Sequence, residues 1–76
     1  IIVQLPLPSP APTDEILATI APEKDVDGLS PNALYTSATA TAIDWLLAGY
    51  NVELRGKRIG IVGRGRLVGA PLEKLW

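Results

Sequence analysis

The sequence predicts an α/β protein in which short parallel strands are covered by helices. Residues 1–5 and 58–62 are short runs rich in apolar and β-branched side chains, which is typical of buried parallel strands. Between them, residues 16–20 and 39–48 carry apolar side chains at helical spacing. The second run leads into a glycine-rich turn and a helix start, an order that in α/β proteins builds a phosphate-binding loop.

The composition is that of a folded chain with a restricted chemical repertoire. The chain has 76 residues, of which 47% are hydrophobic, and this excludes a disordered character. It contains no cysteine and no histidine, so it lacks thiolate chemistry and the commonest general base and metal ligand. No apolar run approaches the roughly 20 residues of a membrane span, and prolines interrupt the first apolar stretch. We therefore expect a soluble, cytoplasmic protein that binds no metal and no membrane.

Charge is distributed unevenly along the chain. Residues 1–50 carry one basic and six acidic residues, a net charge of −5, whereas residues 51–76 carry six basic and two acidic residues, a net charge of +4. The basic half contains the glycine-rich turn, which favours an anionic ligand there. Nucleic acid is not expected as a partner, because the basic residues are not interleaved with aromatic ones and the net charge is −1.

The first part of the chain is expected to form a strand, a proline-rich loop and a short helix. Gln4 is the one polar side chain of the strand at residues 1–5, and Pro6 ends that strand because proline cannot donate to a ladder. Thr13 is a suitable N-cap for the helix. Pro22 is expected to stop it.

An acidic turn follows at residues 23–28, where the sequence is Glu-Lys-Asp-Val-Asp-Gly. Gly28 is expected to take a positive φ in this turn. One interpretation is a solvated, turn-forming cluster of charges. A calcium site is the alternative, although two carboxylates separated by one apolar residue fall well short of an EF-hand loop.

The second part is expected to contain a loop, a helix, a strand and the start of a further helix. Residues 29–37 have neither a helical nor a strand pattern, and residues 39–48 form the clearest helix, with Gly49 as its C-terminal stop. The apolar stripe of this helix consists of Ala42, Ile43, Leu46 and Leu47. Pro71 is expected as the first residue of the last helix.

The glycine-rich turn has the spacing Gly63-x-Gly65-x-x-x-Gly69, one residue longer than the usual dinucleotide fingerprint. Two interpretations stay open on this stretch alone. It is a phosphate-binding loop, or it is a plain glycine turn between a core strand and a helix.

Three separate motifs, in matching order and spacing, resemble those of one family. They are Val-Gln-Leu-Pro-Leu-Pro at residues 3–8, Ala-Pro-Glu-Lys-Asp-Val-Asp-Gly at residues 21–28, and Gly-Arg-x-x-x-Val-Gly-x-Pro at residues 63–71, which Gly56-Lys57 precedes. The chain resembles the bifunctional methylenetetrahydrofolate dehydrogenase/methenyltetrahydrofolate cyclohydrolase family over nearly its whole length. The resemblance implies a two-domain enzyme. Residues 1–50 would belong to the folate-binding domain with its linking helix, and residues 51–76 to the start of a Rossmann-like NAD(P)-binding domain.

The resemblance implies two chemical steps in one-carbon metabolism and purine biosynthesis. Hydride passes from the methylene carbon of 5,10-methylenetetrahydrofolate to a nicotinamide cofactor, and the resulting methenyl cation is hydrolysed to 10-formyltetrahydrofolate. Folate is therefore the implied substrate. A homodimer is the implied assembly.

The resemblance also assigns residues to the folate site. Gln4 matches the glutamine that supports a catalytic lysine, and with Val3 and Leu5 it belongs to the substrate-binding motif. Asp27 matches the aspartate that grips the pterin through paired N–H donors, and it is expected with Gln4 among the catalytic residues. Asp25 is expected to be structural, capping or closing the turn. The alternative for Gln4 is a strand side chain bonded to backbone.

On the cofactor side, Gly63, Arg64 and Gly65 match the family's cofactor-binding loop. Arg64 resembles a clamp for the 2′-phosphate of NADP, with Arg66 two residues further on, so NADP is expected over NAD. The alternative for Arg64 is an ordinary surface arginine.

The sequence departs from the family's pattern at five places, one of which is Ala42 in place of a glycine. The Tyr-x-x-x-Lys motif, which carries the catalytic lysine, does not occur here and would lie upstream of Ile1. The Pro-Cys-Thr-Pro segment is replaced by Ser-Ala-Thr-Ala at residues 37–40, the loop from Gly28 to Tyr35 is shorter, and Gly65 stands in place of a serine. Because the chain starts in an apolar run and stops one turn into a helix, we expect a fragment of a longer protein.

These departures leave three functions open. The leading one is the folate dehydrogenase/cyclohydrolase. The second is a divergent relative that keeps a single activity or only binds folate or a nucleotide. The third is a purely structural interaction fragment.

Overall fold

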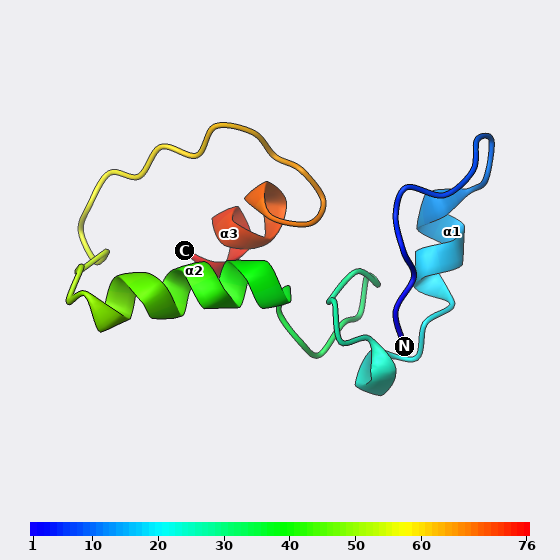
Figure 1. Ribbon diagram of the computed structural model, residues 1–76, viewed down its shortest axis with the longest axis horizontal. Coiled ribbons are helices and arrows are strands. Elements are labelled where there is room, and N and C mark those ends of the chain that lie inside the picture. The colour runs from blue at the N-terminus through cyan, green and yellow to red at the C-terminus, as the bar shows by residue number, and fades with distance from the viewer.

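The computed structural model describes all residues from Ile1 to Trp76 and contains helices joined by long loops (Figure 1). In chain order the elements are α1 (Thr13–Ala18), the 3₁₀ helix η1 (Pro22–Lys24), α2 (Ala38–Gly49) and α3 (Gly69–Leu75). α1 and η1 lie beside the N-terminal segment. α3 packs against α2, and the chain between these two helices arches away from α2 before it returns (Figure 1).

No residue lies in a β-strand, so the predicted α/β architecture, with parallel sheets and a Rossmann-like cofactor domain, is wrong for this chain. Residues 1–5 and 58–62 make no backbone–backbone hydrogen bond. A strand is stable only when a neighbouring strand satisfies its N–H and C=O groups, and neither segment has such a neighbour. The first segment is held at its start instead, where the Ile1 ammonium donates to the carbonyl of Lys24 at 2.6 Å.

α2 is the longest helix, and its bounds confirm the prediction of a helix at residues 39–48 to within one residue at each end. Ser37 caps its start, because the Oγ accepts from the N–H of Ala40 at 3.5 Å. Gly49 is the last helical residue and not the stop that was predicted. The positive φ that turns the chain away falls on Asn51, at 59°, and asparagine tolerates this conformation better than most residues.

α1 begins one residue earlier than predicted and ends at Ala18, before the predicted stop at Pro22. Thr13 is its first helical residue and makes no side-chain capping bond, so the predicted N-cap is wrong. The helix ends before Pro22 is reached, because the N–H and the Oγ1 of Thr19 both donate to the carbonyl of Ile16, at 3.1 Å and 2.6 Å. Pro22 then begins η1.

α3 begins two residues earlier than predicted. Gly69 is its first residue, which makes Pro71 the third and not the first. Proline is tolerated there because the N–H groups of a first helical turn have no partner within the helix. The Trp76 indole Nε1 donates to Asp44 Oδ1 at 2.9 Å and joins the end of α3 to α2.

The apolar core is small. Its buried hydrophobic residues are Leu17, Ile20, Ala40 and Leu72. The radius of gyration is 14.1 Å, larger than the roughly 11 Å of a compact domain of this length. The stripe predicted on α2 is only partly covered, since Ile43 and Leu47 are half-buried whereas Ala42 and Leu46 are exposed. No helix combines the length and the apolar character needed to cross a membrane.

Candidate functional site

Asp25 organises the acidic turn from its centre. The residue is fully buried, and its carboxylate accepts from the N–H of Ser30 at 2.7 Å and from the N–H of Leu29 at 3.2 Å. Gly28 has the expected positive φ, at 67°. Burial raises the pKa of the Asp25 carboxyl, but the two N–H donors stabilise the charged form and hold its pKa below the ordinary value. Asp25 thus closes the turn, as expected from the sequence.

The calcium alternative gains no support from this turn. The Asp25 oxygens face the N–H groups of their own turn. The chain contains no group of three or more acidic side chains placed to hold a metal ion.

The turn places Asp27 at a small pocket of about 190 Å³. The pocket is lined by Asp27 and Leu29, by the N-terminal segment, by the start of α2 and by Leu67 of the glycine-rich loop. All four residues that the sequence assigns to the substrate line it, namely Val3, Gln4, Leu5 and Asp27. The structure thus brings two motifs that are separate in the sequence into one concave site.

Gln4 and Asp27, which both line this pocket, differ in their hydrogen bonding. Gln4 is exposed, and its Nε2 donates to the neighbouring carbonyl of Leu5 at 3.2 Å, which is the backbone bond considered as an alternative. Asp27 is half-buried and forms no ion pair. A carboxylate and an amide beside the apolar Val3 and Leu5 suit a flat heterocycle that carries N–H donors on one edge.

The glycine-rich loop folds back tightly on the start of α3. Gly63 has a φ of 103°, and a Cβ on Gly69 would overlap the carbonyl oxygen of Gly63 and lie 2.9 Å from its carbonyl carbon. The N–H groups of Gly63, Arg64 and Gly65 donate to no backbone carbonyl. The loop therefore presents free N–H donors, a donor set that fits a phosphate. The strand that precedes such a loop in dinucleotide-binding proteins is not formed.

The loop adjoins the pocket that contains Asp27. Leu5 and Leu67 line that pocket and also a neighbouring one of about 530 Å³, to which Gly65 and Arg66 belong. Residues of the substrate motif and residues of the glycine-rich loop therefore face the same concave region.

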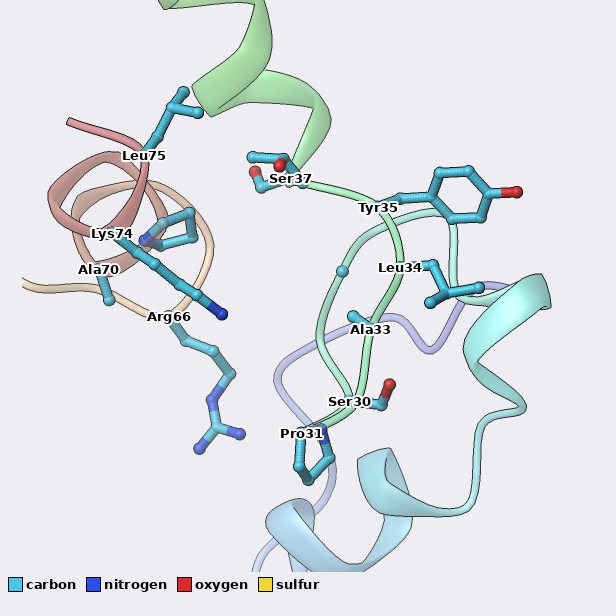
Figure 2. Close-up of a pocket in the computed structure, with 13 residues that line it drawn as sticks. Ser30, Pro31, Ala33, Leu34, Tyr35, Ser37, Arg66, Ala70, Lys74 and Leu75 are labelled. Atoms are coloured by element: carbon cyan, nitrogen blue, oxygen red, sulfur yellow. The ribbon is translucent and has the colours of Figure 1, made fainter.

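A third pocket, of about 450 Å³, separates the loop at residues 28–37 from α3 (Figure 2). Lys74 and Arg66 lie on one side of it, and Ser37 lies at its end, where α2 begins (Figure 2).

Both arginines of the glycine-rich loop already have acidic partners. Arg64 Nε lies 2.7 Å from Glu73 Oε2, and Arg66 Nη1 lies 2.6 Å from Asp14 Oδ1. The Arg64 and Glu73 side chains are 77% and 53% exposed, and such pairs contribute only about 0–1 kcal/mol. A phosphate can therefore displace Glu73 from Arg64 at little cost.

Several residues that line the site carry no role in the sequence-based assignment. Ser37, Thr39 and Leu67 line the same pocket as Gln4 and Asp27. A serine directly before a helix is a recognisable N-cap signal, so Ser37 was accessible to sequence reasoning. No local sequence signal identifies Leu67, because it lies at the pocket only through contacts with residues distant in the sequence.

Curated relatives match the chain along its whole length. A protein from Lactococcus lactis subsp. cremoris (strain MG1363) is 42% identical over 84 residues, which cover 99% of this chain and 30% of the relative. A protein from Cenarchaeum symbiosum (strain A) is 45% identical over 85 residues, with 100% and 30% covered. One from Hydrogenobaculum sp. (strain Y04AAS1) is 41% identical over 86 residues, with 99% and 31% covered.

All three relatives are named Bifunctional protein FolD, and the chain spans about 30% of their length. No family model and no solved structure matches the chain. The matched regions cover 99% and 100% of the chain in the first two relatives and therefore include the three motifs that carry the resemblance. The chain therefore belongs to the FolD family, the bifunctional dehydrogenase/cyclohydrolase family that these motifs resemble.

Proposed function

We propose that the chain is part of an enzyme that oxidises 5,10-methylenetetrahydrofolate with NADP and hydrolyses the product to 10-formyltetrahydrofolate. The observation that carries the proposal is the pocket in which Val3, Gln4, Leu5 and Asp27 meet. The kinship with FolD proteins supports it, as does the position of the glycine-rich loop beside that pocket.

The proposed reaction has two steps. A hydride leaves the methylene carbon and is accepted by the nicotinamide ring, which gives the 5,10-methenyl cation. Water then adds to the cationic carbon, a proton is released and the ring opens to the 10-formyl product. Asp27 accepts hydrogen bonds from the N–H edge of the pterin, and Gln4 hydrogen-bonds and orients a catalytic amine.

The two parts of the chain divide this work. Residues 1–50 contribute to the folate side and residues 51–76 to the cofactor side, where the free N–H groups of the glycine-rich loop and the Arg64 guanidinium hold phosphate. The charge distribution supports this division, because the first part is acidic and the second is basic. The bound cofactor supplies the hydride acceptor.

We expect a higher kcat/KM for NADP than for NAD, because an arginine–phosphate pair is charge-assisted and often bidentate. Arg64→Ala should lower the value for NADP and leave that for NAD nearly unchanged. Glu73→Gln should raise the affinity for NADP by no more than about fivefold, since it removes only an exposed competitor. Steady-state kinetics with both cofactors check this. Equal use of NAD, or an equal loss with both cofactors in Arg64→Ala, contradicts it.

A relative with a single activity is the second candidate. The observation that favours it is the position of Ser37, Ala38 and Thr39, which line the proposed folate pocket where the family has Pro-Cys-Thr. Replacing a proline and a cysteine in the wall of the site alters the shape of the pocket. A pocket of altered shape can support one of the family's two steps without the other.

The two candidates are separated by assaying each step by itself. Reduction of NADP in the presence of 5,10-methylenetetrahydrofolate reports the dehydrogenase, and loss of the methenyl absorbance reports the cyclohydrolase. Both signals are expected from the full-length protein. One signal without the other selects the second candidate, and the absence of both overturns the proposed function.

A further inference from the structure

Ser37 joins two regions of the chain that are far apart in sequence. Its side chain is buried, with 8% of the residue exposed, at the junction between the loop at residues 28–37 and α2. The Oγ accepts from the N–H of Ala40 at 3.5 Å and donates to the carbonyl of Leu67 at 2.8 Å. The second bond spans 30 residues and ends in the glycine-rich loop.

Leu67 is the residue through which this bond acts on the site. It lines the pocket that contains Gln4 and Asp27 and also the neighbouring pocket that contains Gly65. A shift of Leu67 therefore changes the spacing between the proposed folate side and the proposed cofactor side. Ser37 itself lines the first of these pockets, and it stands at the edge of the pocket beside α3 (Figure 2).

Few other contacts hold the loop in this position. Residues 58–64 make no backbone–backbone hydrogen bond. The first such bond after them joins the loop to the start of α3, where Ala70 N–H donates to the Gly65 carbonyl at 2.9 Å. The ion pairs of Arg64 and Arg66 involve exposed side chains and hold the loop weakly. The bond from Ser37 is partly buried, so water competes less with it.

We propose that Ser37 is a positioning residue that holds the glycine-rich loop against the folate pocket through the Leu67 carbonyl. This inference rests on the proposed function. It follows that Ser37 serves the two steps unequally. Hydride transfer needs the methylene carbon and the nicotinamide to be aligned across the two sides, whereas hydrolysis needs only folate and water on one side.

The test compares Ser37→Ala with Ser37→Thr and with Ser30→Ala in the full-length protein. Ser30 is a matched control, because it is as buried as Ser37, at 7% exposed, and its side chain makes no hydrogen bond to the glycine-rich loop. We expect Ser37→Ala to lower the dehydrogenase kcat by about 10- to 100-fold relative to the cyclohydrolase kcat, since a displacement of 1 Å can cost 100-fold in an aligned reaction. Ser37→Thr keeps the hydroxyl and should restore most of the ratio, and Ser30→Ala should keep it.

A merely structural role for Ser37 predicts a different result. Loss of its helix cap would reduce the folded fraction and lower both activities equally, with no change in their ratio. An unchanged ratio in Ser37→Ala therefore overturns the inference, and so does an equal change in Ser30→Ala.

Amide hydrogen exchange keeps the inference separate from the proposed function. Exchange at Ala70, whose N–H donates to the Gly65 carbonyl, should be faster in Ser37→Ala than in the wild type or in Ser30→Ala. Wild-type protein without either activity overturns the proposed function and, with it, the positioning role in catalysis. The exchange data are independent of activity, and they decide whether the Ser37–Leu67 contact holds the loop. Exchange that does not differ between Ser37→Ala and Ser30→Ala overturns that contact.

Discussion

Replacing Asp25 with alanine is expected to lower the free energy of unfolding by about 2–4 kcal/mol, because two backbone N–H groups lose a charged acceptor. Both donors, on Leu29 and Ser30, belong to the loop that connects the acidic turn to α2. Asp25→Asn keeps one acceptor oxygen and should show a smaller loss. Urea unfolding followed by tryptophan fluorescence measures the difference. Glu23→Ala is the control, since this exposed neighbour makes no ion pair.

The Asp25 effect should also depend on pH with a defined sign. The pKa of Asp25 is lowered in the folded state, so the folded chain binds the proton less readily than the unfolded chain does. The stabilisation is therefore complete above the unfolded pKa of about 3.9, and it is lost as the pH falls through the folded pKa. The difference between wild type and Asp25→Ala should narrow between pH 5 and pH 2. A difference below 1 kcal/mol at pH 7, or one that grows on acidification, contradicts this account.

Replacing Gly69 with alanine should disturb the close approach between the glycine-rich loop and the start of α3. The new Cβ would overlap the Gly63 carbonyl oxygen and lie 3.1 Å from the Cα of Arg64, and all these neighbours are backbone atoms that cannot rotate away. We expect a loss of about 1–3 kcal/mol in stability, typical of overpacking, together with weaker binding of NADP.

Gly60→Ala is the matched control for this variant. A Cβ at Gly60 has no neighbour within 4 Å, and the same methyl group is added to the same basic half of the chain. Thermal unfolding and isothermal titration with NADP compare the two proteins. If Gly69→Ala melts and binds like Gly60→Ala, the close approach between the loop and α3 does not exist in solution.

Local patterns predicted the parts of this structure that depend on neighbouring residues. The α2 helix follows from apolar residues at helical spacing, and the turn at Asp25 and Gly28 follows from short polar residues and glycine. The prediction of strands at residues 1–5 and 58–62 was wrong, because a strand depends on a partner strand that its own sequence does not specify.

At the candidate site, too, local motifs predicted individual residues but not the contacts between distant parts of the chain. The motifs identified Gln4 and Asp27, but their meeting in one pocket depends on the path of the chain through the turn that Asp25 closes. The bond from Ser37 to Leu67 and the pairing of Arg64 with Glu73 join residues from different elements. No local periodicity encodes such contacts, so they emerged only from the structure.

The most direct measurement of the central claim is a calorimetric titration of the full-length wild type and its Asp27→Ala variant with tetrahydrofolate, and separately with NADP. A hydrogen bond to a charged group contributes about 1.5–3 kcal/mol, so the variant should bind folate roughly 10- to 100-fold more weakly. Its affinity for NADP should be unchanged, and Glu23→Ala should bind both ligands like the wild type. An Asp27→Ala protein that binds folate as tightly as the wild type contradicts the assignment of this pocket to the substrate.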